Sequence, residues 1–219
     1  PVRIASCRSY CGSNGGHDHT GLLPFGQNDT VIIIIRYNVP GIQSWPCPMH
    51  PAFDLKIMIK EYIAENEGKM MEDLFSLIRI PSISALPEHH DDMLACAQRW
   101  AQLLLEAGAD EAIVMPSQGN PIVFGQKTVD PKAKTVLVYA HYDVMPAEPL
   151  ELWKSQPFEP EIRDRHIWAR GADDDKGQSF IQVKAFEYLV KNGLLKNNVK
   201  FIFEGEEEIG SPSLEAFCK

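Results

Sequence analysis

Apolar residues recur at steps of three and four positions in two stretches of this chain, a spacing that predicts amphipathic helices. The first stretch begins at Ile59 and ends before Pro81, since the residue before a proline is disfavoured in a helix. The second begins at Asp91-Asp92, whose side chains can cap a helix, and Gly108 is placed to end it. A third helix is predicted for residues 177–191. We expect the apolar side of the first two helices to be core.

Short runs rich in β-branched and aromatic residues predict four strands. They are residues 112–115, 121–125, 135–140 and 199–203. Strands that alternate with helices are typical of an α/β domain. The sequence therefore predicts the α/β class.

The first 57 residues have a different character. They hold six of the sixteen prolines and three of the five cysteines, but only four basic and three acidic residues, and no strong helical period. No basic region leads into an apolar core of the kind that an export signal contains. We therefore predict that residues 1–57 are an N-terminal extension outside the fold, flexible or non-native, and that the folded domain covers residues 58–219.

Composition and charge narrow the range of partners. The chain has 21 basic and 30 acidic residues and a net charge of −9, which argues against nucleic acid and anionic membrane surfaces. Its longest aliphatic run, residues 31–35, is far shorter than the roughly 20 apolar residues that cross a bilayer. Five cysteines, an odd number, do not suggest a disulfide framework. We expect a cytoplasmic protein with no nucleic acid and no membrane as partner.

A first candidate site follows the predicted strand 135–140, which runs directly into His141-Tyr-Asp143. Residues i and i+2 of an extended chain project to the same side, so His141 and Asp143 can share one site. A metal-binding imidazole commonly donates its other ring N–H to a carboxylate, which Asp143 can supply. Taken alone, the motif leaves open that His141 is a polar strand-end residue without a metal.

Two acidic segments accompany this motif. In residues 170–177, three consecutive aspartates repel one another unless a cation or a helix N-terminus stabilises them. In residues 204–208, four glutamates follow an apolar strand directly, and such oxygen-rich clusters suit divalent metals. Each segment by itself is also compatible with a solvated acidic surface. All three motifs lie at the carboxyl ends of strands or in the loops after them, where open α/β sheets bind ligands, so we expect one shared site.

The three motifs, in this order and at this spacing, resemble those of the di-zinc metallopeptidase family that includes carnosinase-like dipeptidases, aminoacylases and glutamate carboxypeptidases. Residues 144–160 are similar to the dipeptidase branch in particular. The resemblance covers residues 58–219 and implies a three-layer α/β catalytic domain with a central, mostly parallel or mixed sheet flanked by helices. The chain ends before the family's lid domain, so we expect the N-terminal half of a catalytic domain.

The resemblance also implies a role for each matched residue. His141 would bind one zinc ion and Glu208 the other, while Asp174 would bridge both. Asp143 would orient His141, and Glu207 would be the general base that takes a proton from the water between the metals. Manganese or cobalt ions are alternatives to the two zinc ions.

The resemblance also bears on the residues beside the matched positions and on the parts of the family pattern that this sequence does not contain. The family places a cis peptide after its bridging aspartate, here Asp174–Asp175. Asp173 and Glu206 are extra acids beside the matched positions, and we assign them no role. Further ligands and the lid, which supplies dimer contacts, lie beyond the matched motifs. We therefore expect the 219-residue chain to be inactive and to bind zinc poorly, and the full-length parent to form a homodimer through its lid.

These implications predict a hydrolase. The full-length parent would be a zinc-dependent metallopeptidase that cleaves the peptide bond of dipeptides or short peptides, so its partner would be a small peptide substrate. One alternative is an N-acyl amino acid deacylase, because the same metal site attacks either amide. Another is a non-catalytic metal-binding domain on the same fold, against which the presence of Asp143 and Glu207 argues.

Overall fold

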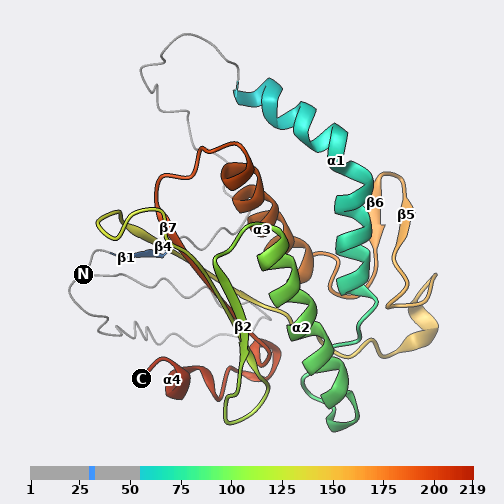
Figure 1. Ribbon diagram of the computed structural model, residues 1–219. Helices are drawn as coiled ribbons and strands as arrows, with labels where there is room; N and C mark the ends of the chain where they lie inside the picture. The colour runs from blue at the N-terminus through green and yellow to red at the C-terminus, as the bar shows by residue number, and fades with distance from the viewer. Residues whose placement is uncertain (1–29, 33–54) are drawn as a thin grey trace, which may run out of the picture.

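Five strands form one mixed sheet in the computed structural model, which describes residues 30–32 and 55–219. The strand order is β1-β4-β7-β3-β2, with β1, β4 and β7 parallel and with β3 and β2 antiparallel to their neighbours (Figure 1). Their bounds are β1 Thr30–Ile32, β2 Glu111–Met115, β3 Ile122–Lys127, β4 Thr135–His141 and β7 Asn198–Glu204. The expected α/β class, with a mixed sheet flanked by helices, is confirmed, and the four predicted strands match to within a residue or two.

Strand β1 lies within the segment that the sequence assigns to an N-terminal extension. Its three residues pair in parallel with the start of β4, Thr30 opposite Thr135. The rest of that segment, residues 1–29 and 33–54, lies outside the described residues. The domain boundary at residue 57 therefore stays a prediction.

The helices are α1 (Leu55–Ile78), α2 (His90–Glu106), α3 (Lys176–Lys191) and the short α4 (Leu214–Phe217). Single 3-10 turns are η1 (Pro87–His89), η2 (Leu150–Leu152) and η3 (Glu207–Ile209). The three predicted helices are confirmed, and Gly108 follows α2 with a φ of 102°, a conformation that favours glycine. The expected cap is wrong, because α2 begins at His90 and Asp91 and Asp92 lie in its first turn. No helix among the described residues has the length and apolar composition that a membrane span requires.

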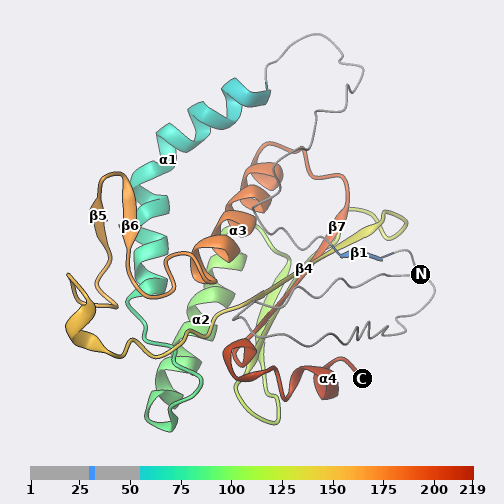
Figure 2. The same cartoon turned by 180° about the vertical axis from the view of Figure 1, so that it is seen from behind.

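A small hairpin, β5 (Glu161–Arg163) with β6 (His166–Trp168), forms a second sheet beside the C-terminal half of α1 (Figure 2). No pattern in the sequence predicts this hairpin. Its strands have only three residues each, and its turn uses Asp164 and Arg165, both with positive φ, in place of the Asn-Gly or Asp-Gly pair that announces such turns.

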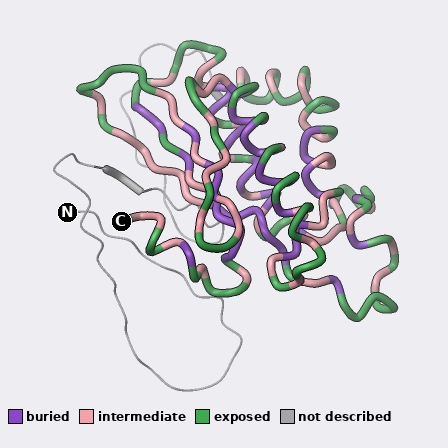
Figure 3. The backbone as a smooth tube through the Cα atoms, turned by 60° about the horizontal axis from the view of Figure 1, so that its bottom comes forward, coloured by how far each residue is buried: buried purple, intermediate pink, exposed green. Residues whose placement is uncertain are grey.

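The hydrophobic core lies between the sheet and the helices (Figure 3). Phe201 and Phe203 are two positions apart in β7, so their side chains point to the same face of the sheet. The ring of Phe203 packs edge-on against Trp100 of α2 at 5.0 Å, and that of Phe201 against Phe186 of α3 at 5.1 Å. Helices α2 and α3 thus cover one face of the sheet and bury the centre of β7.

Helix α1 is core only in part. Leu74, Leu77 and Ile78 are buried, whereas Ile59 and Ile63 are 37% and 48% exposed. The N-terminal half of α1 projects away from the sheet and the other helices (Figure 1). The prediction that the whole apolar stripe of this helix is core is therefore wrong for its first turns, because periodicity identifies an apolar side but not the element that covers it.

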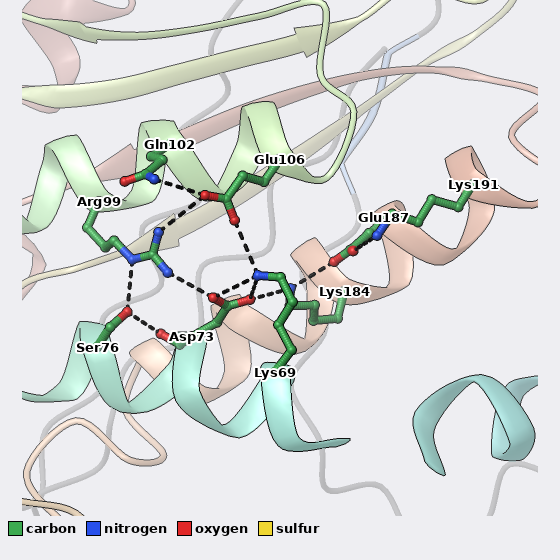
Figure 4. A network of polar contacts seen from close by, with 9 residues as sticks. All are labelled: Lys69, Asp73, Ser76, Arg99, Gln102, Glu106, Lys184, Glu187 and Lys191. Carbon is green, nitrogen blue, oxygen red and sulfur yellow. Dashed lines mark hydrogen bonds and ion pairs between the residues drawn. The ribbon is translucent and has the colours of Figure 1, made fainter. Parts of the chain in front are cut away.

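A polar network joins α1, α2 and α3 (Figure 4). The buried carboxylate of Asp73 accepts hydrogen bonds from Lys69 at 2.9 Å, Arg99 at 2.9 Å and Lys184 at 3.0 Å. Lys184 also donates to Glu187 at 2.8 Å. Burial alone would raise the pKa of Asp73, but the hydrogen bonds from Lys69 and Lys184 outweigh it and lower that pKa. The network stabilises the packing of the three helices.

Candidate metal centre

The neighbouring strands β4 and β7 end at one edge of the sheet, with His141 directly opposite Glu204. Asp143 follows the end of β4, and Glu207 and Glu208 form η3 just after β7. Because parallel neighbours present their carboxyl ends together, two motifs that are more than sixty positions apart in sequence become one cluster.

The imidazole of His141 lies between acidic groups on both sides. Its Nδ1 is 3.1 Å from the main-chain oxygen of Asp143 and 3.3 Å from Oδ1 of the same residue. Its Nε2 is 3.1 Å from Asp174 Oδ1 and 3.9 Å from Glu207 Oε2. Burial would lower the pKa of His141, but the hydrogen bonds to Asp143 and Asp174 raise it to about 11. With Nδ1 engaged by Asp143, Nε2 is the ring nitrogen that faces the cluster.

Asp143 is fully buried and is surrounded by donors. Its Oδ1 accepts the main-chain N–H of Glu207 at 3.2 Å, and its Oδ2 accepts that of Glu208 at 3.1 Å. The Ser84 hydroxyl donates to Oδ2 at 2.6 Å. One carboxylate therefore contacts His141 and also holds the backbone of η3.

The three aspartates differ in their surroundings. Asp173 is exposed, and the Asp174 side chain is 72% exposed at the point where it meets His141. Asp175 is half-buried, and its Oδ2 accepts the main-chain N–H of His141 at 3.1 Å and the Ser179 hydroxyl at 2.7 Å. Burial raises the pKa of Asp175. The peptide Asp174–Asp175 is cis, as the family resemblance implied.

The loop that carries these aspartates is anchored by its neighbours. Gly171 has a φ of 76°, and a Cβ on Gly177 would lie 2.0 Å from the main-chain oxygen of Ala172, so this close approach requires glycine. Lys176 is completely buried and donates to the main-chain oxygens of Leu77 at 2.9 Å and Ile80 at 2.6 Å. The start of α3 is thus tied to the end of α1.

The four glutamates of residues 204–208 divide into two pairs. Glu204 is buried and accepts the hydroxyl groups of Tyr139 and Ser211. Glu206 is buried and accepts the main-chain N–H groups of Asn120 and Ser213. These two carboxylates hold the loop in place, which gives Glu206 a structural role.

The second pair, Glu207 and Glu208, lies beside the cluster. The side chain of Glu207 is 42% exposed. Burial and the charge of Asp174 raise the pKa of the half-buried Glu208. Acidic charge thus accumulates around the single imidazole of His141, a distribution that a bound cation would balance.

Among the described residues, His141, Asp174 and Asp175 each offer a metal-ligand atom within 4.8 Å of the others. Two members of the predicted ligand set are therefore together, while Glu208 is outside this group and Asp175 joins it. An imidazole nitrogen with several carboxylates is a donor set that suits zinc. The residues present fit a divalent metal, and the assignment of Glu208 as a ligand stays a prediction.

Ser84 and Asp175 make contacts that no pattern in the sequence predicts. Ser84 lies in the loop between α1 and η1, far from the three motifs, and a serine in a loop carries no signal of its own. Asp175 was visible as the third of three aspartates, but only the fold shows that it binds the backbone of His141.

Residues 137–219 match the family described as Peptidase family M20/M25/M40. The chain is 31% identical over 148 residues to a cysteinylglycine-S-conjugate dipeptidase of Corynebacterium striatum, covering 68% of the chain and 32% of that protein. It is 38% identical over 174 residues to the Beta-Ala-His dipeptidase of Rattus norvegicus, covering 73% and 35%. The crystal structure of human carnosine dipeptidase 1 superimposes with a TM-score of 0.68 at 27% identity, over 76% of this chain and 38% of that one. The chain thus spans about a third of the length of these relatives.

Proposed function

Because residues 137–219 belong to peptidase family M20/M25/M40, we propose that this protein is a zinc-dependent dipeptidase that hydrolyses the peptide bond of dipeptides or short peptides. Two of its relatives carry dipeptidase names, which supports this substrate class. The observation that carries the proposal is the position of His141, whose ring nitrogens face Asp143 on one side and Asp174 on the other.

His141 Nε2 and the carboxylates of Asp174 and Glu208 would hold two zinc ions, with Asp174 between them. This assignment is supported by the 3.1 Å approach of Asp174 to His141 and by the position of Glu208 in η3, where its main-chain N–H donates to Asp143. When bound, zinc supplies a Lewis acid that polarises the substrate carbonyl and makes water a nucleophile near neutral pH.

Glu207 is proposed as the residue that moves the proton. Its Oε2 lies 3.9 Å from His141 Nε2, beyond hydrogen-bonding distance, so this contact does not engage its lone pairs. It takes a proton from the attacking water and delivers it to the amine nitrogen of the leaving group. Glu204 and Glu206 are unsuited to this task because their carboxylates are buried and already accept two hydrogen bonds each.

Asp143 is proposed to orient the imidazole. Its contact with Nδ1 keeps Nε2 directed at Asp174 and the acidic cluster. A carboxylate in this place also makes the ring nitrogen on the other side a stronger donor of its electron pair. The hydrogen bond from Glu207 N–H to Asp143 holds the proposed base in a constant position relative to that ring.

Hydrolysis assays test the proposal. The protein is purified both as this 219-residue chain and within the longest reading frame that encodes it, and is assayed with Cys-Gly, β-Ala-His and N-acetyl amino acids. We expect dipeptide hydrolysis by the longer protein that a chelator abolishes and zinc restores. Preference for N-acetyl amino acids would instead identify a deacylase. Zinc binding without hydrolysis of any of these compounds would identify a non-catalytic metal-binding domain.

A further inference from the structure

Ser84 contacts the carboxylate that lies behind His141, although it is 59 positions away from Asp143 in the chain. Its hydroxyl donates to Asp143 Oδ2 at 2.6 Å, the shortest of the hydrogen bonds to that carboxylate. We propose that Ser84 is a positioning residue of the metal centre, which acts through Asp143 on the orientation of His141 and of η3. The inference rests on the proposed function, because it assigns Ser84 to the same site.

Four polar groups surround the Asp143 carboxylate, two on each oxygen. Oδ2 accepts Ser84 Oγ–H and the main-chain N–H of Glu208, while Oδ1 accepts the N–H of Glu207 and lies 3.3 Å from His141 Nδ1. Asp143 is fully buried, so water does not replace a lost donor without entering the site. The contact with Ser84 holds Oδ2 and thereby leaves Oδ1 directed at His141 and Glu207.

The position of Ser84 is set by main-chain contacts of the two residues before it, Ser82 and Ile83. Ile83 forms a parallel bridge with Val144, and the main-chain N–H of Val144 donates to the Ser82 oxygen at 2.9 Å. The Ser82 hydroxyl donates to the main-chain oxygen of Tyr142 at 2.7 Å. The loop after α1 therefore runs beside the segment that follows β4. The main-chain pairing, in which the Ser82 hydroxyl takes no part, directs the Ser84 hydroxyl at Asp143.

Two neighbouring serines offer a matched comparison. Both hydroxyl groups belong to the same loop and donate to the same segment, but Ser82 binds a main-chain oxygen and Ser84 binds the carboxylate. If the loop matters only for stability, loss of either hydroxyl has the same kind of effect. If Ser84 acts through Asp143, only its loss changes the metal centre.

Zinc affinity of the 219-residue chain is measured by competition with a chromophoric chelator for Ser84→Ala, Ser84→Thr and Ser82→Ala, with a melting curve for each. We expect Ser84→Ala to weaken zinc binding by about 10- to 100-fold, as is usual when a partner of a ligand is lost. Ser84→Thr keeps a hydroxyl group, so it should bind zinc about as tightly as the unmodified chain. Ser82→Ala should lower the melting temperature and leave zinc affinity nearly unchanged. Equal loss of affinity in the two alanine variants would overturn the inference.

A second measurement needs no metal. In the zinc-free chain, the ring N–H of His141 at Nδ1 is followed by nitrogen-15 NMR. Ser84→Ala should shift this signal and speed its exchange with water, while Ser82→Ala should leave it in place. An unchanged signal in Ser84→Ala contradicts the inference even if zinc binding is too weak to rank the variants. Hydrolysis is tested separately, so an active peptidase in which Ser84→Ala is silent would overturn this inference alone.

Discussion

The main-chain N–H of Glu207 donates to the carboxylate of Asp143 over 3.2 Å. The same carboxylate lies 3.3 Å from His141 Nδ1. The proposed base and the proposed ligand are therefore attached to one buried group, although they follow different strands. A change at Asp143 is expected to disturb both, whereas changes at Glu207 or Glu208 should separate proton transfer from metal binding.

Glu207→Gln keeps the size of the side chain and removes its ability to accept a proton. In the longer protein we expect turnover to fall by at least about 100-fold, the lower end of general-base contributions, while bound zinc persists. Glu208→Gln should instead lose zinc. Steady-state kinetics and metal analysis measure both effects, and Asp173→Asn, at an exposed acid next to Asp174 in the sequence, is the control. If Glu207→Gln lost zinc and Glu208→Gln kept it, the assignment would be wrong by one residue.

Asp143→Asn replaces an oxygen with an amide NH₂ that cannot accept a hydrogen bond. The main-chain N–H groups of Glu207 and Glu208 point at different oxygens, so one of them loses its acceptor in either orientation of the amide. We expect zinc affinity to fall by about 10- to 100-fold and stability by about 1 to 3 kcal/mol. Chelator competition and urea unfolding measure the two effects. Unchanged zinc affinity would show that Asp143 does not orient His141.

Acid should destabilise the helix packing through Asp73 and Glu187. Burial would raise the pKa of each carboxyl, but hydrogen bonds from lysines lower both below their ordinary values of 3.8 and 4.5. The folded state then binds fewer protons than the unfolded state at low pH. The stabilisation is complete above about pH 5 and is lost as the pH falls through 4.5 and 3.8 toward the lowered values.

Asp73→Asn tests this network directly. We expect the free energy of unfolding to fall by about 3 kcal/mol, the lower end for breaking a buried ion pair. Below pH 5, this free energy should decrease less steeply with falling pH than that of the unmodified chain. Glu159→Gln, which removes the exposed pair with Arg79, should leave stability unchanged and serves as the control. Urea unfolding at a series of pH values measures both variants. The same acid dependence in Asp73→Asn and the unmodified chain would contradict the prediction.

Deletion of residues 1–54 removes β1 and leaves α1 complete. We expect the unfolding free energy to change by less than about 1 kcal/mol, because β1 is a strand of three residues at the edge of the sheet. Thermal or urea unfolding of the shortened chain provides the measurement. A larger loss would place this segment within the fold and move the domain boundary toward the N-terminus.

The 219-residue chain should bind zinc weakly and show no turnover. In the proposed ligand set, one ion has His141 and Asp174 and the other has Asp174 and Glu208, whereas catalytic zinc usually has three protein ligands. Zinc stoichiometry and Cys-Gly hydrolysis on the purified chain provide the check. Two tightly bound ions with turnover would show that Asp175 or another residue of this chain completes the set.

The sequence by itself determined the three long helices, four strands of the main sheet, and the edge of the sheet at which the chemistry lies. Alternation places His141 and Asp143 on one side of an extended segment, and the helical period identifies the buried face of α2. Both are local properties, because a two-residue or a 3.6-residue repeat depends only on backbone geometry. For the same reason, the positions of the acidic motifs after strands could be predicted.

Only the tertiary structure decided which of these acids meet. It buried Glu204 and Glu206 and left Glu207 beside His141. It also brought Ser84 to Asp143 across 59 positions. The four glutamates of residues 204–208 are chemically identical, so their roles depend on the donors and the burial that distant segments supply. Such contacts follow from the packing of helices and strands on one another, which a local pattern does not specify.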